Sequence, residues 1–231
     1  MITCEEIYDL HTTGALESAL CEAYREIPLD SRNSMRKNDT PLHMACAFAD
    51  ENAVRILLER GADVNVRNDD GDTPLCVLAK RKCCGKETTI AGIAGLLVSK
   101  EARVPRSGKN TTALIEAVGN RHFLMADILL MSGCRIDSTN SNGNNVLHVI
   151  CQSAGDIAYD IKRTKERIAD FSERWYSEKD KREAYENMEY LEEADRQCFL
   201  TAKRILENGQ IDTEDKNNIG KTALDIAWET G

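Results

Sequence analysis

Few aromatic residues and few prolines occur in this sequence, and both scarcities bear on its fold class. Aromatic residues make up 5% of the 231 positions, and the chain has 4 prolines. Strands are enriched in aromatic residues, and proline breaks the interior of a helix, so this composition favours helices. With 42% hydrophobic and 30% charged residues, the chain is typical of folded globular proteins, and its length allows one elongated domain or two compact ones.

Long apolar runs and an excess of positive charge are also missing. No stretch approaches the roughly 20 apolar residues of a membrane span, and Met1–Glu6 carries neither the basic nor the apolar part of a signal peptide. The formal net charge of -9 works against binding to nucleic-acid phosphates or to anionic membranes. We therefore predict a cytoplasmic protein with no nucleic-acid and no membrane partner. Delivery into a host cell as an effector is compatible with the same features.

The sequence also lacks the motifs that mark common enzyme classes. It contains no GxSxG, no Walker-type phosphate loop, no HExxH and no GxGxxG after a strand. Neither His11 nor His122 has an evident nucleophile or carboxylate partner. We therefore expect a non-catalytic protein with no catalytic residues and no cofactor.

Nine cysteines are present, but they are scattered and form no CxxC pair. Their odd number and the missing signal peptide favour reduced thiols that serve as small core residues. Cys83 and Cys84 lie in a basic loop, Lys80–Lys86, for which a solvated loop is favoured over a metal or redox element. A structural role is likewise favoured over a metal site for two HxxC pairs, His43 with Cys46 and His148 with Cys151.

An internal repeat organises most of the chain. The segment TPLHMAC at Thr40–Cys46 returns 33 residues later as TPLCVLA at Thr73–Ala79. Further copies follow at Thr112–Val118, Asn145–Cys151 and Thr222–Ala227. A second landmark, an Ile-Leu run with a glycine after it, keeps the same phase at Arg55–Asn65, Asp127–Asp137 and Arg204–Asp212. Because two landmarks share one period, we infer a stack of related structural units.

The residues of each unit predict two helices and a loop. Threonine followed by proline is a favourable helix start, because the hydroxyl caps free amides and proline suits the first turn. Small residues such as Ala45 and Ala79 let the first helix approach its neighbour closely. A glycine such as Gly61, after the apolar second helix, supplies the left-handed residue that ends it. Asp69–Gly71 and Asn140–Gly143 are turn sequences that lead to the next unit.

These residues resemble the ankyrin repeat, whose signature is a TPLH helix start, an apolar second helix and a GADVN-like exit. The segment Asp39–Gly71 is a nearly complete match, whereas the third and fourth copies are degenerate. The resemblance implies an all-α ankyrin-repeat solenoid of stacked helix-turn-helix units with finger loops. It also implies that such a stack binds a protein partner along its concave side.

We predict a single ankyrin-repeat domain over residues 1–231. Residues 1–33 are predicted to form an N-terminal cap with two short helices, Glu5–Leu10 and Ala15–Tyr24. The repeats are predicted at 34–71, 72–106, 107–143 and 144–220, followed by an incomplete C-terminal repeat at 221–231. Because that last unit has no second helix, we expect that the native chain continues beyond it or that another chain covers its apolar face.

The fourth repeat carries a long insertion, 155–198, between its two helices. Two apolar series with heptad-like spacing predict helices of about 20 to 28 residues that pack as an antiparallel arm directed away from the fingers. The first series is Ile157, Ile161, Thr164, Ile168, Phe171 and Trp175, and the second is Ala184, Met188, Leu191, Asp195, Cys198, Ala202 and Ile205. At the tip, packing within the hairpin is favoured over docking to a partner for Trp175, Tyr176 and Tyr185.

The leading hypothesis is a non-catalytic scaffold that binds a protein partner along the concave face. A second surface on the arm, or self-association through the arm or the C-terminal end, is a further hypothesis. The alternatives are a bacterial effector-like ankyrin protein acting on host proteins and a cysteine-based metal- or redox-responsive adaptor. Phe48 is the first residue to test in the candidate partner-binding set, which consists of Met44, Phe48, Arg67, Asn68, Asp69, Asp70, Val77, Arg81, Glu116, Asn120, Asn140, Asn142, Gln152, Trp175 and Tyr176.

Overall fold

The structure is a computed structural model of the chain, and it describes residues 2–82, 86–102, 113–134, 136–169, 177–208 and 211–230. These residues form helices α1 to α11 and no strand, apart from an isolated bridge between Asn33 and Asp39. The predicted all-α fold class is therefore confirmed. The chain divides into two compact units: Met1–Gly108 with Thr112–Cys134, called unit 1, and Lys109–Thr111 with Arg135–Gly231, called unit 2.

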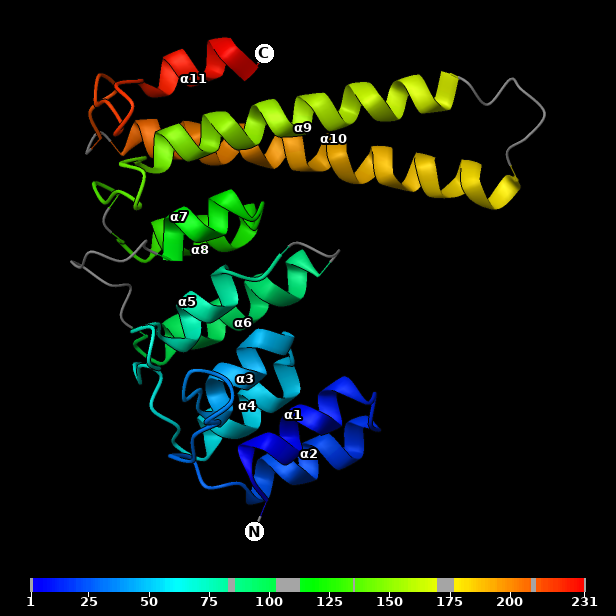
Figure 1. Cartoon of the computed structure of the whole chain (residues 1–231), viewed down its shortest axis with the longest axis vertical. Coiled ribbons are helices and arrows are strands. Elements are labelled where there is room, and N and C mark those ends of the chain that lie inside the picture. Colours follow the sequence, from blue (N-terminus) through cyan, green and yellow to red (C-terminus); the bar gives the residue numbers. More distant parts are fainter. Residues whose placement is uncertain are drawn as a thin grey trace. The chain divides into compact units, whose positions relative to one another are not determined.

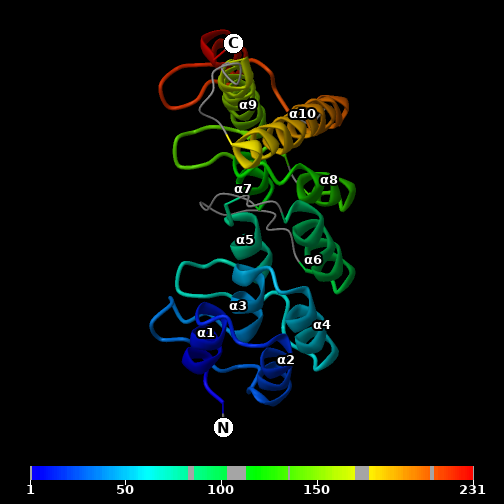
Figure 2. The same ribbon diagram turned by 90° about the vertical axis from the view of Figure 1, so that its right-hand side faces the viewer.

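Unit 1 is a stack of successive helix pairs (Figure 1). The pairs are α1 (Cys4–Thr12) with α2 (Glu17–Glu26), α3 (Pro41–Phe48) with α4 (Glu51–Glu59), α5 (Pro74–Ala79) with α6 (Glu87–Ser99), and α7 (Ala113–Gly119) with α8 (Phe123–Met131). The first helices contact one another in order, α1 on α3, α3 on α5 and α5 on α7, and the second helices do the same. Figure 2 shows the two resulting layers, with the connecting loops beside the first helices.

Threonine and proline start the repeat helices as predicted. Thr40 and His43 form a reciprocal capping box at the start of α3, and the Thr73 hydroxyl accepts a hydrogen bond from the Cys76 amide at the start of α5. Proline occupies the first turn of both helices, where its missing N–H has no intrahelical partner to lose. These local signals explain why each first helix begins where it does.

Leucines at equivalent repeat positions fill the interior of unit 1. Each buried leucine contributes about 1.5–3 kcal/mol relative to an exposed one. Small side chains between the first helices are fully buried, which confirms the predicted close approach of neighbouring pairs. The leucines are Leu42, Leu75 and Leu114 on first helices and Leu57, Leu97 and Leu129 on second helices, and the small residues are Ala45, Ala79 and Ala117.

The loops between the pairs are called fingers, and those that the structure describes open with an asparagine. In unit 1 the Asn68 side-chain oxygen accepts a hydrogen bond from the Asp72 amide (3.0 Å), and its Nδ2 donates to Oδ1 of Asp39 in the preceding finger (2.8 Å). In unit 2 Asn217 repeats both contacts, with Lys221 (3.0 Å) and with Asn144 (2.8 Å). The asparagine therefore closes its own finger and joins it to the one before.

Unit 2 contains the long helical insertion. Helix α9 (Val146–Ala169) has 24 residues, α10 (Glu178–Glu207) has 30, and the two pack side by side, while α11 (Ala223–Thr230) packs on α9. At 1.5 Å per residue the two long helices extend roughly 36 Å and 45 Å. The predicted antiparallel arm is therefore present, with α10 slightly longer than expected (Figure 1).

The arm corrects part of the apolar pattern predicted for α10. Asp195 was placed in the buried stripe, but its side chain is exposed, and Ala194 is buried instead. In the same way, Thr201 is buried more deeply than the predicted Ala202. The buried face of α10 consists of Ala184, Leu191, Ala194, Cys198, Thr201 and Ile205. Ala194 is adjacent to Asp195, and Thr201 is adjacent to Ala202. Heptad-like spacing therefore did not distinguish the predicted buried pair, Asp195 and Ala202, from the observed pair, Ala194 and Thr201.

Candidate protein-interaction groove

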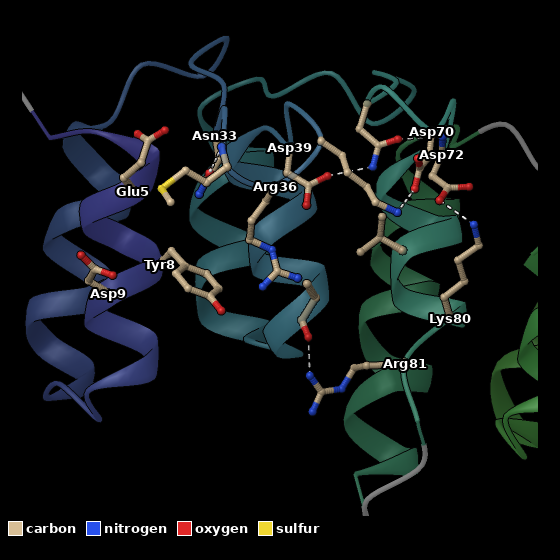
Figure 3. Close-up of a pocket in the computed structure, with 15 residues that line it drawn as sticks. Glu5, Tyr8, Asp9, Asn33, Arg36, Asp39, Asp70, Asp72, Lys80 and Arg81 are labelled. Carbon is tan, nitrogen blue, oxygen red and sulfur yellow. Dashed lines mark hydrogen bonds and ion pairs between the residues drawn. The ribbon is translucent and has the colours of Figure 1, made fainter.

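A groove of about 740 Å³ lies in unit 1 between α1, the first finger (Asn33–Asp39), α3 and α5 (Figure 3). We call it the concave groove. Its volume lies in the range of pockets that hold small ligands or a few side chains of a peptide. The groove is lined by Glu5, Tyr8, Asp9, Asn33, Met35, Arg36, Lys37, Asp39, Ala47, Asn68, Asp70, Asp72, Val77, Lys80 and Arg81.

Aromatic side chains join α1 to the end of α3 beside this groove. The Tyr8 and Phe48 ring centroids are 5.7 Å apart, and Phe48 stacks on His11 at 4.1 Å with an interplanar angle of 6°. The His11 Nε2 also lies 2.9 Å from the Tyr24 hydroxyl oxygen. Burial lowers the pKa of His11 below its ordinary value, so the imidazole is neutral near pH 7. Phe48 therefore helps to hold the first helix pair in place.

The groove walls carry charges of both signs, and several are paired. Lys37 pairs with Asp70 across two fingers, and Lys80 donates to Asp72 at 2.6 Å. Burial lowers the pKa of Lys80, but the hydrogen bond and negative charge of Asp72 outweigh it and raise that pKa above its ordinary value. Arg81 donates a hydrogen bond to the Ala47 carbonyl oxygen. These contacts hold the fingers and α5 in a defined arrangement around the groove.

Two of the predicted partner-binding residues are buried. Met44 is 1% exposed and receives a hydrogen bond from Asn33 at its sulfur (3.6 Å). Asn68 is 8% exposed because both ends of its amide are used within the fingers. Both residues belong to the framework of the stack. Met44 lies on α3, a short helix. The sequence pattern of such a helix does not show which of its faces is covered by a finger and which faces the groove.

Other predicted residues in unit 1 lie at or near the concave groove. Asp70, Val77 and Arg81 line it, and Phe48 is half-buried beside it. The exposed residues Arg67 and Asp69 support the fingers, since Arg67 donates to the Gly71 carbonyl (2.7 Å) and Asp69 accepts from Asn38 (2.8 Å). On α7, Glu116 and Asn120 are half-buried, and Asn120 donates to the Ala79 carbonyl of α5 (3.1 Å).

The remaining predicted residues belong to unit 2. Asn140 is half-buried and organises its finger by accepting from the Asn142 and Asn144 amides, whereas Asn142 and Gln152 are exposed. Trp175 and Tyr176 lie outside the described residues, whereas Tyr185, from the same predicted tip, is exposed.

Sequence reasoning missed Tyr8, Arg36 and Lys80 as groove residues. The N-terminal helix pair was treated as a cap, although Tyr8 forms one wall of the groove. A signal for Arg36 was available, because the first finger is two residues longer than the second: Asn33 precedes Thr40 by seven positions, whereas Asn68 precedes Thr73 by five. Arg36 and Lys37 lie in this longer finger, and Lys37 adopts a positive φ of 54°.

The first HxxC pair makes structural contacts. His43 is buried and hydrogen-bonded at both ring nitrogens, and burial raises the pKa of the Cys46 thiol far above its ordinary value. Across the described ranges no group of three His, Cys, Asp or Glu side chains is arranged to hold a metal ion. Cys83 and Cys84 lie outside those ranges. In the same ranges, no helix combines the length and apolar character that a membrane crossing requires.

Comparisons with known proteins agree with the repeat geometry. Residues 37–69 match the family model described as Ankyrin repeat. Ankyrin repeat-containing protein P1E11.10 of Schizosaccharomyces pombe is 34% identical over 68 residues, which are 26% of this chain and 33% of that protein. Phosphocholine transferase AnkX of Legionella pneumophila is 26% identical over 201 residues, which are 81% of this chain and 20% of that protein. The chain therefore spans a third or less of each of these relatives.

Helix pairs, fingers and the matched segment together define an ankyrin-repeat stack. Residues 37–69 carry an ankyrin repeat, and the resemblance inferred from the TPLH segment is confirmed. Ankyrin repeats are protein-interaction modules and are generally non-catalytic.

Proposed function

We propose that this protein is a non-catalytic scaffold that binds a segment of a protein partner in the concave groove of unit 1. The observation that supports the proposal most directly is the groove itself, about 740 Å³ in volume and bordered by first helices and fingers. Apolar surface of Tyr8, Ala47 and Val77 lines it together with charged side chains of both signs. Protein interfaces commonly combine apolar contacts with charged groups in this way.

Filling the groove tests this proposal. Ala47 is a half-buried lining residue with a side chain of one carbon, so Ala47→Gln occupies the groove without removing a side-chain contact. A random 12-residue peptide display library is selected on the whole protein, and the affinities of enriched peptides are measured by fluorescence anisotropy. We expect Ala47→Gln to weaken them roughly tenfold or more, because each lost anchor contact is worth about 1.4 kcal/mol or more.

The matched control is Ala19→Gln, the same change at an exposed alanine on α2 that does not line the groove. Peptides that bind both variants as tightly as the unaltered protein would contradict the proposal. This pair is more informative than changing Phe48, Asp69 and Asp70, because those side chains hold helices and fingers together.

A second candidate function is self-association in unit 2, which exposed apolar side chains support. Leu224 and Trp228 on α11 are 64% and 80% exposed, and Tyr159 and Phe199 are exposed on the arm. Large exposed aromatic side chains are favoured anchors in protein interfaces. Light scattering coupled to size exclusion tests it: a species of one chain at all concentrations up to about 0.1 mM, a typical weak-dimer range, would contradict this candidate.

The effector-like alternative has weaker support. The phosphocholine transferase activity for which AnkX is named belongs to that protein, and the matched region is 20% of it. Within this chain the proposal of a binding scaffold needs no catalytic residue. The cytoplasmic location of the protein stays a prediction from the sequence.

A further inference from the structure

Arg36 differs from the other cations that line the concave groove. Lys37 and Lys80 pair with aspartates, and Arg81 donates to a backbone carbonyl. The Arg36 guanidinium lies over the Tyr8 ring, 4.8 Å from its centroid, and among the described residues no group accepts a hydrogen bond from it. An exposed guanidinium is thus held at the groove with its hydrogen-bond donors available.

Among the described residues, no carboxylate of the groove forms an ion pair with this guanidinium. Glu5 accepts from the Ser34 amide (3.1 Å) and hydroxyl (3.3 Å), and Asp39 accepts from Asn68 (2.8 Å). In Figure 3 the Tyr8 ring lies between Asp9 and Arg36. Lys37, Lys80 and Arg81 are engaged by Asp70, Asp72 and the Ala47 carbonyl, so among the described lining residues Arg36 is the cation that can attract a carboxylate of a partner.

Position over a ring also prepares Arg36 for a partner. A guanidinium that lies over an aromatic ring keeps its N–H groups available, because they point outward in its own plane. The ring restricts the long side chain before binding, which reduces the entropy lost when a partner arrives. The neighbouring Met35 side chain is 85% exposed and offers an apolar contact next to the charge.

We propose that the concave groove selects its partner by an acidic side chain whose carboxylate binds the Arg36 guanidinium, next to an apolar side chain that contacts Met35. The carboxylate accepts two parallel N–H hydrogen bonds, the geometry for which arginine is suited. The partner is therefore an extended protein segment in which aspartate or glutamate adjoins an apolar residue. This inference rests on the proposed function, because it assigns the chemistry of the same groove.

Sequencing the peptides selected on the unaltered whole protein tests the inference. We expect enrichment of aspartate or glutamate next to an apolar residue. Replacing that acid by its amide in the tightest peptide should weaken binding roughly 10- to 100-fold, the range for a lost charge-assisted hydrogen-bond pair. Arg36→Gln should weaken the acidic peptide by a similar factor and should leave the affinity of the amide peptide nearly unchanged.

Matched variants separate charge from geometry. Arg36→Lys keeps the charge but loses the planar fork, so an intermediate affinity is expected. Arg25→Gln removes an exposed arginine from α2, outside the groove, and should leave binding unchanged. Thermal unfolding followed by circular dichroism checks that each variant is folded, and a selection on Arg36→Glu should enrich basic instead of acidic residues.

The outcomes distinguish the two proposals. Peptides that Ala47→Gln displaces, but that lack acidic enrichment or bind Arg36→Gln equally well, would overturn the role of Arg36 and leave the groove as the binding site. Peptides insensitive to Ala47→Gln, or no enriched peptides at all, would overturn the groove proposal and the Arg36 inference with it.

Discussion

His43 and His148, three positions after Thr40 and Asn145, join neighbouring repeats. His43 Nδ1 lies 2.8 Å from the Thr40 hydroxyl oxygen, and its Nε2 lies 3.0 Å from the Asp72 carbonyl oxygen in the next finger. In unit 2 His148 makes the equivalent contacts with Asn145 (2.6 Å) and Lys221 (3.0 Å). Each imidazole therefore bonds at the start of its own helix and holds the following repeat.

His43→Gln tests this link and its pH dependence. The loss of a buried two-ended contact should reduce the free energy of unfolding by about 1–3 kcal/mol at pH 7. Burial lowers the pKa of His43 below its ordinary 6.5, so its contribution is fully present above about pH 6.5 and is lost as the pH falls toward the folded-state pKa. Urea denaturation followed by circular dichroism between pH 7 and 5 should therefore show a shallower fall in stability for His43→Gln than for the unaltered protein.

Cys76→Ala is the control, because Cys76 occupies the same repeat position and, within the described residues, its side chain bonds to Thr73 of its own repeat. It should lose less stability, and its pH slope should match that of the unaltered protein. Burial also lowers the pKa of His11 and His122, so a residual slope is expected in every variant. Equal slopes for His43→Gln and the unaltered protein would contradict the assignment.

The sequence predicted the starts of some helices correctly, but it did not predict which face of α10 is buried. The starts of α3 and α5 follow directly from threonine, proline and the residue that completes the cap. The buried face of α10 did not follow, because Ala194 and Asp195 are adjacent and either alternation fits a heptad. Contact with α9 decides the choice: Asn187 donates to the Thr164 hydroxyl (3.2 Å), and the Cys198 thiol lies against the Ile150 carbonyl (3.8 Å).

Paired substitutions test the packing of the arm. Ala194→Asp places a carboxylate at a 3% exposed position, which should destabilise the arm by about 2 kcal/mol or more. Asp195→Ala, one residue further, changes an exposed side chain and should alter stability by about 0.5 kcal/mol or less. Hydrogen exchange of the α9 and α10 amides measures both. A larger loss of stability for Asp195→Ala than for Ala194→Asp would indicate that Asp195 is the buried residue, as the sequence pattern predicted.

Two units make up the whole molecule, and the arm belongs wholly to unit 2. The hydrogen bonds that support the concave groove, from Lys37, Lys80 and Arg81, all lie within unit 1. The base of the arm also keeps its own buried residues, with Val146 and Ile150 on α9 and Cys198 on α10. The arm beyond this base is therefore expected to be separable from the stack, while the single domain over residues 1–231 stays a prediction.

Deletion of Asp156–Gln197, with Gly155 and Cys198 joined by a short turn, should leave a folded protein. We expect the thermal midpoint to stay within about 4 °C of the original, the shift that a change of roughly 1 kcal/mol in stability produces. Hydrogen exchange of the α3 and α5 amides reports whether unit 1 is still folded. Peptide binding in the groove should be unchanged. Loss of self-association in this variant would assign that property to the arm, whereas loss of structure in α3 and α5 would contradict its separability.

Sequence by itself determined the repeat, the helix starts, the fingers and the existence of the arm. These features depend on interactions between residues close in the chain: a hydroxyl and an amide three positions away, or apolar side chains one turn apart. Only the tertiary structure decided which side chains reach the concave groove. Tyr8 and Arg36 meet there although they are 28 positions apart, whereas Met44 is buried beneath a finger. Exposure depends on which neighbouring repeat covers each face, and that packing is a property of the stack.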